Sequence, residues 1–339
     1  MKQAVKFTVY TLVILPCLLL SACMVPRETI DFSNIKTITA ALWLKVTDYP
    51  KAMLEGPAFD RNGDLYFCDT HYEVTEGGGK IYKVSLADKL VKTIYDDPDH
   101  SGFASIKIHK DGRLFLCGFY SGDIVIMNPD GTGKKVLTAS YKGRKLIPDD
   151  MIFDNDGNFY FTDYSGEIWD PTGGVYRVPS DLSSIDLVYK GLAKGNGVSL
   201  SPDGKQLWVA ETYWTGQFGR TLRSFDLEKQ DKASGLLAPS KVYSFPDGTG
   251  WPDSNAVDSD GNVYQAMSGG GRVIIVNPQG KALAQVIIPS EYGEKYKGTT
   301  NVAFQPGTDT GFMTASGDLG GAIFTFKALA KGLPLFSHQ

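Results

Sequence analysis

A short motif recurs along most of the chain, and its spacing restricts the folds that the chain can adopt. In each copy an apolar strand pattern meets a turn that contains glycine, usually as Asp-Gly, and a second apolar or aromatic strand pattern follows. Glycine tolerates the positive φ of tight hairpin turns, so each copy predicts a β-hairpin. Successive copies are 45 to 57 residues apart. The six turn glycines are Gly63, Gly112, Gly157, Gly204, Gly261 and Gly307.

Two further strand patterns follow most of the hairpins. A third strand is expected at 79–84 and 122–127, for example, and a fourth at 92–95. Four strands per repeat at this period are typical of a β-propeller. We therefore predict an all-β fold, a six-bladed β-propeller with four antiparallel strands per blade, as a single domain over residues 36–339. Residues 36–47 are expected to supply the outer strand of the last blade and so to close the ring.

The N-terminus has the composition of an export signal. Two lysines precede an apolar run over residues 7–20, which is shorter than the roughly 20 residues of a transmembrane helix. The Leu-Ser-Ala-Cys sequence that ends at Cys23 resembles a bacterial lipobox, in which the cysteine becomes the lipidated first residue of the mature protein. We expect a signal peptide over residues 1–22, lipidation of Cys23 and a tether over residues 23–35. An ordinary signal cleavage nearby is the alternative.

These features predict export to the bacterial cell envelope, with contact to the membrane through the lipid anchor alone. The formal net charge of −4 gives no basic surface for nucleic acid. Cys68 and Cys117 occupy the same register of neighbouring repeats, which places them on different blades and too far apart for a disulfide. We therefore expect two buried free thiols.

One position of the innermost strands is unusually rich in oxygen ligands. This position lies four residues before the end of the innermost strand of each repeat. Because the innermost strands line the central channel, the side chains at this position should lie at one level of the channel. Three carboxylates there would repel one another unless a cation bound. Ca²⁺ accepts several oxygen ligands and is the expected ion. Mg²⁺ and Mn²⁺ are alternatives, and Zn²⁺ is less favoured because none of these residues is His or Cys. The six residues are Glu55, Ala104, Asp149, Asn196, Asp253 and Thr300.

Several motifs resemble those of the senescence-marker/gluconolactonase (regucalcin-like) superfamily, over nearly all of residues 36–335. The segments with this resemblance are 55–60, 196–204 and 252–258. Within the superfamily, the segments 106–115, 149–154 and 173–176 resemble the bacterial drug-response lactonases.

The resemblance implies that Glu55, Asn196 and Asp253 hold a catalytic divalent metal and that Asp253 is the general base or proton donor. Many relatives have Asn where this chain has Asp149, and because Asp150 follows, either aspartate could be the ligand. Ser254 is expected to add a further oxygen ligand. Relatives also have a second cation site before the third repeat, but basic residues stand there in this chain, so we expect no second site.

We therefore expect a Ca²⁺-dependent hydrolase of small cyclic esters, a lactonase of the gluconolactonase type. The metal would polarise the carbonyl, and Asp253 would act as the acid or base. A Gly-x-Ser-x-Gly motif, the sign of a serine hydrolase, is absent. The alternatives are an organophosphate or aryl ester hydrolase at the same site, and a non-catalytic propeller that keeps the metal for binding. The expected partner is a small lactone or ester, and we expect a monomer.

Overall fold

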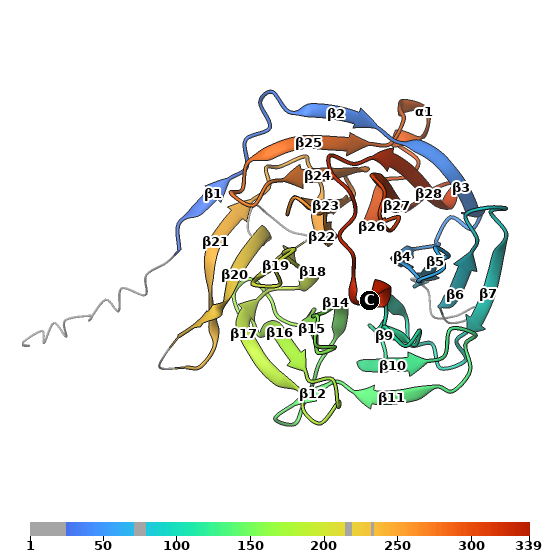
Figure 1. Ribbon diagram of the computed structural model, residues 1–339. Coiled ribbons are helices and arrows are strands. Elements are labelled where there is room, and N and C mark those ends of the chain that lie inside the picture. The colour runs from blue at the N-terminus through green and yellow to red at the C-terminus, as the bar shows by residue number, and fades with distance from the viewer. Residues whose placement is uncertain (1–24, 71–78, 214–218, 232–233) are drawn as a thin grey trace, which may run out of the picture.

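The computed structural model describes residues 25–70, 79–213, 219–231 and 234–339, and the fold of these residues is all-β (Figure 1). Two short helical turns, α1 (Ser290–Gly293) and η1 (Phe336–His338), complete the described secondary structure. Each of the six predicted turn glycines has a positive φ, between 69° and 90°, which confirms the predicted hairpins.

The strands follow one another in groups of four, and within a group each strand pairs antiparallel with the next. The first group is β4 (Leu54–Phe59), β5 (Leu65–Asp69), β6 (Lys80–Val84) and β7 (Val91–Asp96). The second is β8 (Phe103–Ile108), β9 (Leu114–Gly118), β10 (Asp123–Met127) and β11 (Lys135–Thr138). A small hairpin of β12 (Ser140–Tyr141) and β13 (Arg144–Lys145) leads to the third, which is β14 (Pro148–Phe153), β15 (Phe159–Asp163), β16 (Gly173–Val178) and β17 (Asp186–Leu192).

The second half of the chain repeats this order. The fourth group is β18 (Gly195–Leu200), β19 (Gln206–Thr212), β20 (Arg220–Gln230) and β21 (Leu237–Ser244). The next is β22 (Trp251–Val257), β23 (Val263–Ser268), β24 (Arg272–Val276) and β25 (Ala282–Ile287). The last is β26 (Gly298–Phe304), β27 (Thr310–Gly317) and β28 (Gly320–Lys327), joined by β3 (Ala41–Thr47) from the N-terminal part of the chain.

The groups are arranged around a common centre, where the C-terminus also lies (Figure 1). The first strands of the groups, such as β4, β14, β18 and β26, lie nearest the centre, whereas β7, β11 and β21 lie at the periphery. We call these first strands, namely β4, β8, β14, β18, β22 and β26, the inner strands. Every inner strand ends at the residue that the repeat predicted, from Phe59 in β4 to Phe304 in β26.

The N-terminal segment differs in part from the prediction. Residues 41–47 form β3 and pair antiparallel with β28, but residues 36–39 form β2 (Lys36–Thr39), which runs parallel to β25 of the preceding group. The two strands are separated by Ala40, which is buried in the apolar core and donates its N–H to the Ile287 carbonyl (2.9 Å). This anchored alanine directs the chain from the edge of one strand group to the edge of the next.

The segment that was predicted to be a tether also joins the fold. Residues 27–29 form β1 (Arg27–Thr29), which runs parallel to β21, and the following Ile30 is buried among Trp208 and Tyr243. Phe32 and Ile35 also pack against this apolar cluster, because burial removes such side chains from water. The predicted tether is therefore shorter than residues 23–35.

The apolar core lies between neighbouring sheets. Phe59 of the first group packs edge-on against Phe312 of the last, with ring centroids 5.1 Å apart. Phe115 and Phe153 make the same kind of contact between the second and third groups, at 5.0 Å. Cys68 and Cys117 are both buried and unbridged, as predicted. Packing between the sheets therefore holds the inner strands side by side around the centre.

Candidate functional site

The inner strands share an irregularity at the level of the candidate residues. On β14, Asp149 and Asp150 together face the single residue Thr162 of β15, because the pairing shifts between Pro148 and Met151. The pairing of β18 and of β22 shifts at the equivalent places, next to Asn196 and Asp253. Such β-bulges release side chains from the regular alternation of a strand and are common beside active sites. The irregularity explains how a buried strand can present polar residues here.

The predicted ligands are all buried at this level. Glu55, Asp149, Asn196 and Asp253 are between 5% and 9% exposed. Burial raises the pKa of Glu55 well above its usual value, and the charges of Asp253 and Asp149 raise it further. The pKa of Asp149 is likewise raised well above its usual value, first by burial and then by the Asp253 charge. The three carboxylates therefore lie within electrostatic reach of one another although they come from three separate strands.

Asp253 has polar neighbours that partly offset its burial. Burial raises its pKa to about 7, although the Ser254 N–H and the Asn196 and Ser268 side chains lower that pKa. The bond from the Ser254 amide to Asp253 Oδ1 measures 3.0 Å. A carboxyl with a pKa near neutrality can both accept and return a proton at physiological pH.

Two buried oxygens of the candidate ligands have no hydrogen-bond partner. They are Glu55 Oε2 and Asn196 Oδ1. A buried oxygen without a partner is unfavourable, and a hard divalent cation would both satisfy these atoms and neutralise the carboxylates. The residues present therefore fit such an ion. Within the described residues no three Asp, Glu, His or Cys side chains are grouped closely enough to form a metal site on their own.

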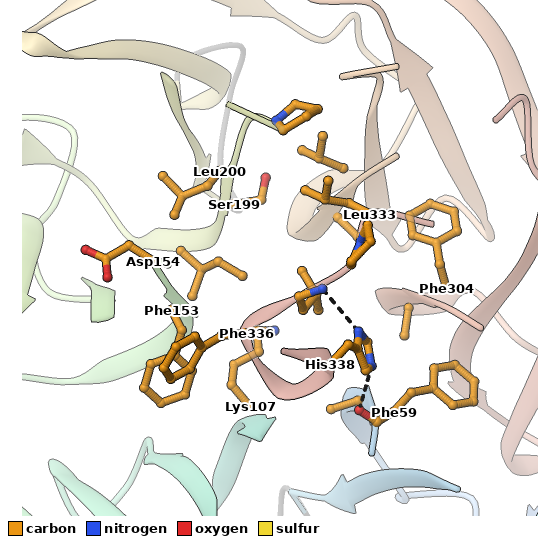
Figure 2. A pocket seen from close by; sticks show the side chains of 18 of the residues that line it. Phe59, Lys107, Phe153, Asp154, Ser199, Leu200, Phe304, Leu333, Phe336 and His338 are labelled. Carbon is orange, nitrogen blue, oxygen red and sulfur yellow. Dashed lines mark hydrogen bonds between the residues drawn. The ribbon is translucent and has the colours of Figure 1, made fainter. Parts of the chain in front are cut away.

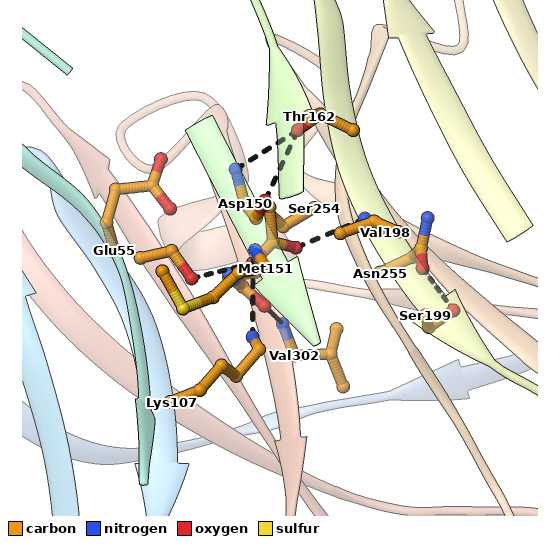
Figure 3. Close-up of polar contacts among 12 residues, drawn as sticks. Glu55, Lys107, Asp150, Met151, Thr162, Val198, Ser199, Ser254, Asn255 and Val302 are labelled. Carbon is orange, nitrogen blue, oxygen red and sulfur yellow. Dashed lines mark hydrogen bonds and ion pairs between the residues drawn. The ribbon is translucent and has the colours of Figure 1, made fainter. Parts of the chain in front are cut away.

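The structure distinguishes the two adjacent aspartates. Asp150 is fully buried, forms an ion pair with Lys107 (Nζ to Oδ1, 3.1 Å) and accepts hydrogen bonds from Ser105 and Val198 (Figure 3). No hydrogen bond or ion pair of the described residues involves the Asp149 carboxylate, which is subject only to burial and like charges. Asp149 therefore has its carboxylate available for an ion, whereas that of Asp150 is used within the protein.

Ser254 is almost completely buried beside Asp253. Its backbone is well held, because its N–H donates to Asp253 and its carbonyl accepts from Gln265 Nε2 (3.3 Å). Gln265 also donates to the carbonyl of Asp253 (2.7 Å). The backbone of this pair is thus fixed from β23.

Sequence reasoning missed a set of threonines that hold the backbone of the candidate ligands. Thr162 on β15 donates to the carbonyl of Asn196 on the next inner strand (2.5 Å), and Thr212 on β19 donates to the carbonyl of Pro252, directly before Asp253. Thr70, just after β5, donates in the same way to the carbonyl of Phe103 (2.6 Å). In these repeats a threonine stands beside an acidic residue at the end of the second strand. This recurring pair is the sequence pattern from which the threonines could have been predicted.

A cavity of about 90 Å³ occupies the opposite end of the inner strands (Figure 2). It is lined by anchor residues such as Phe59 and Phe153 and by the C-terminal segment with Phe336 and His338. His338 is fixed by the Leu335 N–H (3.1 Å) and lies 3.3 Å from the Phe59 carbonyl. Phe59 is four residues, or about 13 Å, along β4 from Glu55. None of the candidate metal ligands lines this cavity, although Lys107, which does, forms an ion pair with Asp150 (3.1 Å).

Comparison with known proteins agrees with this architecture. A family model described as the SMP-30/gluconolactonase/LRE-like region matches residues 53–317. The sequence is 38% identical over 308 residues to lactonase drp35 of Staphylococcus saprophyticus, with 88% of this chain and 90% of that protein covered.

Solved structures share the fold at lower identity. A gluconolactonase from Xanthomonas campestris has a TM-score of 0.62 at 20% identity, covering 90% of this chain and 98% of that one. The calcium-binding protein regucalcin from Agrobacterium tumefaciens has a TM-score of 0.65 at 17% identity, covering 89% and 99%. The family model and the similarity to the staphylococcal lactonase together show that this chain belongs to the SMP-30/gluconolactonase/LRE-like family.

Proposed function

We propose that the protein is a divalent-metal-dependent hydrolase of small lactones. The observation that carries the proposal is the set of mutually repelling buried carboxylates with the unpartnered oxygens Glu55 Oε2 and Asn196 Oδ1. The family relationship to a lactonase supports the reaction class. Lactone hydrolysis needs a group that polarises the carbonyl and a group that moves a proton, and this site offers residues for both.

The proposed scaffold is a six-bladed propeller. Each inner strand contacts the next one along the chain, and β26 contacts β4. The pairing of β3 with β28 joins the N-terminal part of the chain to the last blade. This arrangement would place the candidate ligands around one central channel.

The proposed metal is Ca²⁺, held by Glu55, Asp149, Asn196 and Asp253, with Ser254 as a further oxygen ligand. An all-oxygen set suits Ca²⁺, and Mg²⁺ or Mn²⁺ would find the same donors. The structural neighbour regucalcin is described as calcium-binding, which supports the choice.

The protein's own residues would supply binding and proton transfer. A bound divalent cation polarises a carbonyl oxygen and lowers the pKa of water. Asp253 would take a proton from the attacking water and return it to the ring oxygen that leaves. The Ser254 N–H orients the carboxylate for this transfer. In a lactone the leaving oxygen stays tethered to the product, so no second acid is needed.

The test is hydrolysis of a panel of lactones by the purified protein before and after removal of metal with a chelator. We expect turnover that is lost with the chelator and restored by added Ca²⁺. Turnover that survives complete metal removal would contradict the proposed role of the metal. Calcium binding without turnover of any lactone, aryl ester or organophosphate would instead indicate a binding propeller.

We also propose that the protein is a lipoprotein of the bacterial cell envelope, with Cys23 as the lipidated residue, and that it is a monomer. Residues 1–24, with Cys23 and the signal peptide, lie outside the described residues. No helix in the described part of the chain is long and apolar enough to cross a membrane. The sequence around Cys23 is the support for the anchor.

A further inference from the structure

Lys107 is a buried cation close to the candidate metal ligands. It lies on the inner strand β8, its side chain is 10% exposed, and its ammonium is 3.1 Å from Oδ1 of the fully buried Asp150 (Figure 3). Burying an ion pair costs desolvation free energy that the attraction between the charges often fails to repay. A buried pair is therefore weak evidence for a role in stability, and its position suggests a different role.

The Asp150 carboxylate connects three inner strands. Its Oδ1 accepts hydrogen bonds from Ser105 Oγ of β8 (2.7 Å) and from the N–H of Met151 on its own strand (2.8 Å). Its Oδ2 accepts from the N–H of Val198 on β18 (3.3 Å). Together with Lys107, these donors fix one carboxylate from both sides, so that β8, β14 and β18 are tied together at this level.

The tied backbone is the backbone of two candidate ligands. Asp149 directly precedes Asp150, and Asn196 lies two residues before Val198. The Asp150 N–H donates to Thr162 Oγ1 (3.2 Å), and the same hydroxyl donates to the carbonyl of Asn196 (2.5 Å). Asp150 therefore fixes the backbone positions of Asp149 and Asn196. Its own carboxylate oxygens are occupied by protein donors.

We infer that Lys107 and Asp150 are a positioning pair, which holds Asp149 and Asn196 in place for the divalent cation without binding it. The inference rests on the proposed metal centre. It names residues outside the ligand set and gives them a function that can be measured, because partners of metal ligands typically change metal affinity by about 10- to 100-fold when they are lost.

The charge of Lys107 allows positioning to be separated from simple electrostatics. A lysine ammonium near a cation site repels the cation, so removal of Lys107 should strengthen calcium binding if charge alone matters. If Lys107 positions the ligands, its removal should weaken binding instead. Ser105→Ala gives a second, charge-neutral test, because it removes only the hydrogen bond to Asp150 and leaves every charge in place.

The experiment is isothermal titration of the metal-free protein with Ca²⁺, using the wild type, Lys107→Met and Ser105→Ala. The matched control is Lys134→Met. Lys134 also pairs with a fully buried aspartate, Asp97 (3.4 Å), but it directly precedes the outer strand β11. Thermal unfolding of each variant verifies that it is folded.

We expect Kd to rise about 10- to 100-fold for Lys107→Met and about tenfold for Ser105→Ala, with Lys134→Met unchanged. If either test variant binds Ca²⁺ as tightly as the wild type or more tightly, the positioning role is wrong while the metal centre stands. If Lys107→Met does not fold, Ser105→Ala alone decides the outcome. If the wild type itself binds no Ca²⁺, the proposed metal centre fails and the positioning role fails with it.

Discussion

The Asn196 side chain on β18 interacts with the Asp253 carboxylate on β22 and lowers the pKa of that carboxyl. Two predicted ligands from different repeats therefore lie close to each other. The amide oxygen of Asn196 is buried and has no hydrogen-bond partner. We expect this oxygen to bind the cation.

Calcium affinity should depend on pH. Burial raises the pKa of Asp253 to about 7 and those of Glu55 and Asp149 well above their usual values, so protons compete with the cation for these oxygens. Affinity should rise between pH 6 and pH 8, and binding should release protons. Titration calorimetry in two buffers of different ionisation enthalpy counts those protons. Equal affinity at both pH values, without proton release, would argue against these carboxylates as ligands.

The stability of the metal-free protein should change in the opposite direction. A carboxyl whose pKa is raised in the folded state binds its proton more tightly there than in the unfolded chain. The resulting stabilisation is complete below the ordinary aspartate pKa of 3.8 and is lost as pH rises through about 7 for Asp253. Added Ca²⁺ should therefore raise Tm more at pH 8 than at pH 5.5, which scanning calorimetry measures. A Ca²⁺-induced rise in Tm that is larger at pH 5.5 would oppose this account.

Glu55→Gln should weaken metal binding before it affects chemistry. The substitution keeps the shape of the side chain and removes one negative charge from the ring, so we expect Kd for Ca²⁺ to rise roughly tenfold or more. Excess Ca²⁺ should then partly restore lactone turnover. Measuring turnover over a range of Ca²⁺ concentrations distinguishes this result from a defect in catalysis, in which activity would stay low at every concentration.

Cys23→Ala should abolish membrane attachment. Without the cysteine the precursor cannot be lipidated, so it should stay uncleaved or be released to the soluble fraction. Fractionation of cells that produce the two forms, with antibody detection, is the measurement. If both forms fractionate with membranes alike, Cys23 is not the anchor.

The repeat allowed the sequence to predict much of the fold. The turn glycines and the last residue of every inner strand agree with the structure, because an Asp-Gly turn between apolar strands is a local signal that needs no knowledge of distant contacts. Counting back from those ends predicted Glu55, Asn196 and Asp253 at a common level of three inner strands, β4, β18 and β22. Because the repeats share one register, a position identified in one repeat can be located in the others by counting.

Features that depend on contacts between repeats were not predictable in this way. The turn at Ala40 and the docking of β1 on β21 depend on which sheet edges and apolar surfaces lie nearby. The ion pair that engages Asp150 and not Asp149 is formed with Lys107, which is more than 40 residues earlier in the sequence. A local pattern contains no information on such partners.

The most direct test of the account is the rate of lactone hydrolysis by Asp253→Asn with its metal bound. Asparagine keeps the shape and one oxygen ligand but cannot accept the proton, so at saturating Ca²⁺ the metal should remain bound while proton transfer is lost. We predict that kcat falls on the order of 10²-fold or more, the usual contribution of general acid–base catalysis. Calcium binding is verified by titration of the same preparation. Hydrolysis at the wild-type rate by the metal-loaded variant would contradict the central claim that Asp253 transfers the proton.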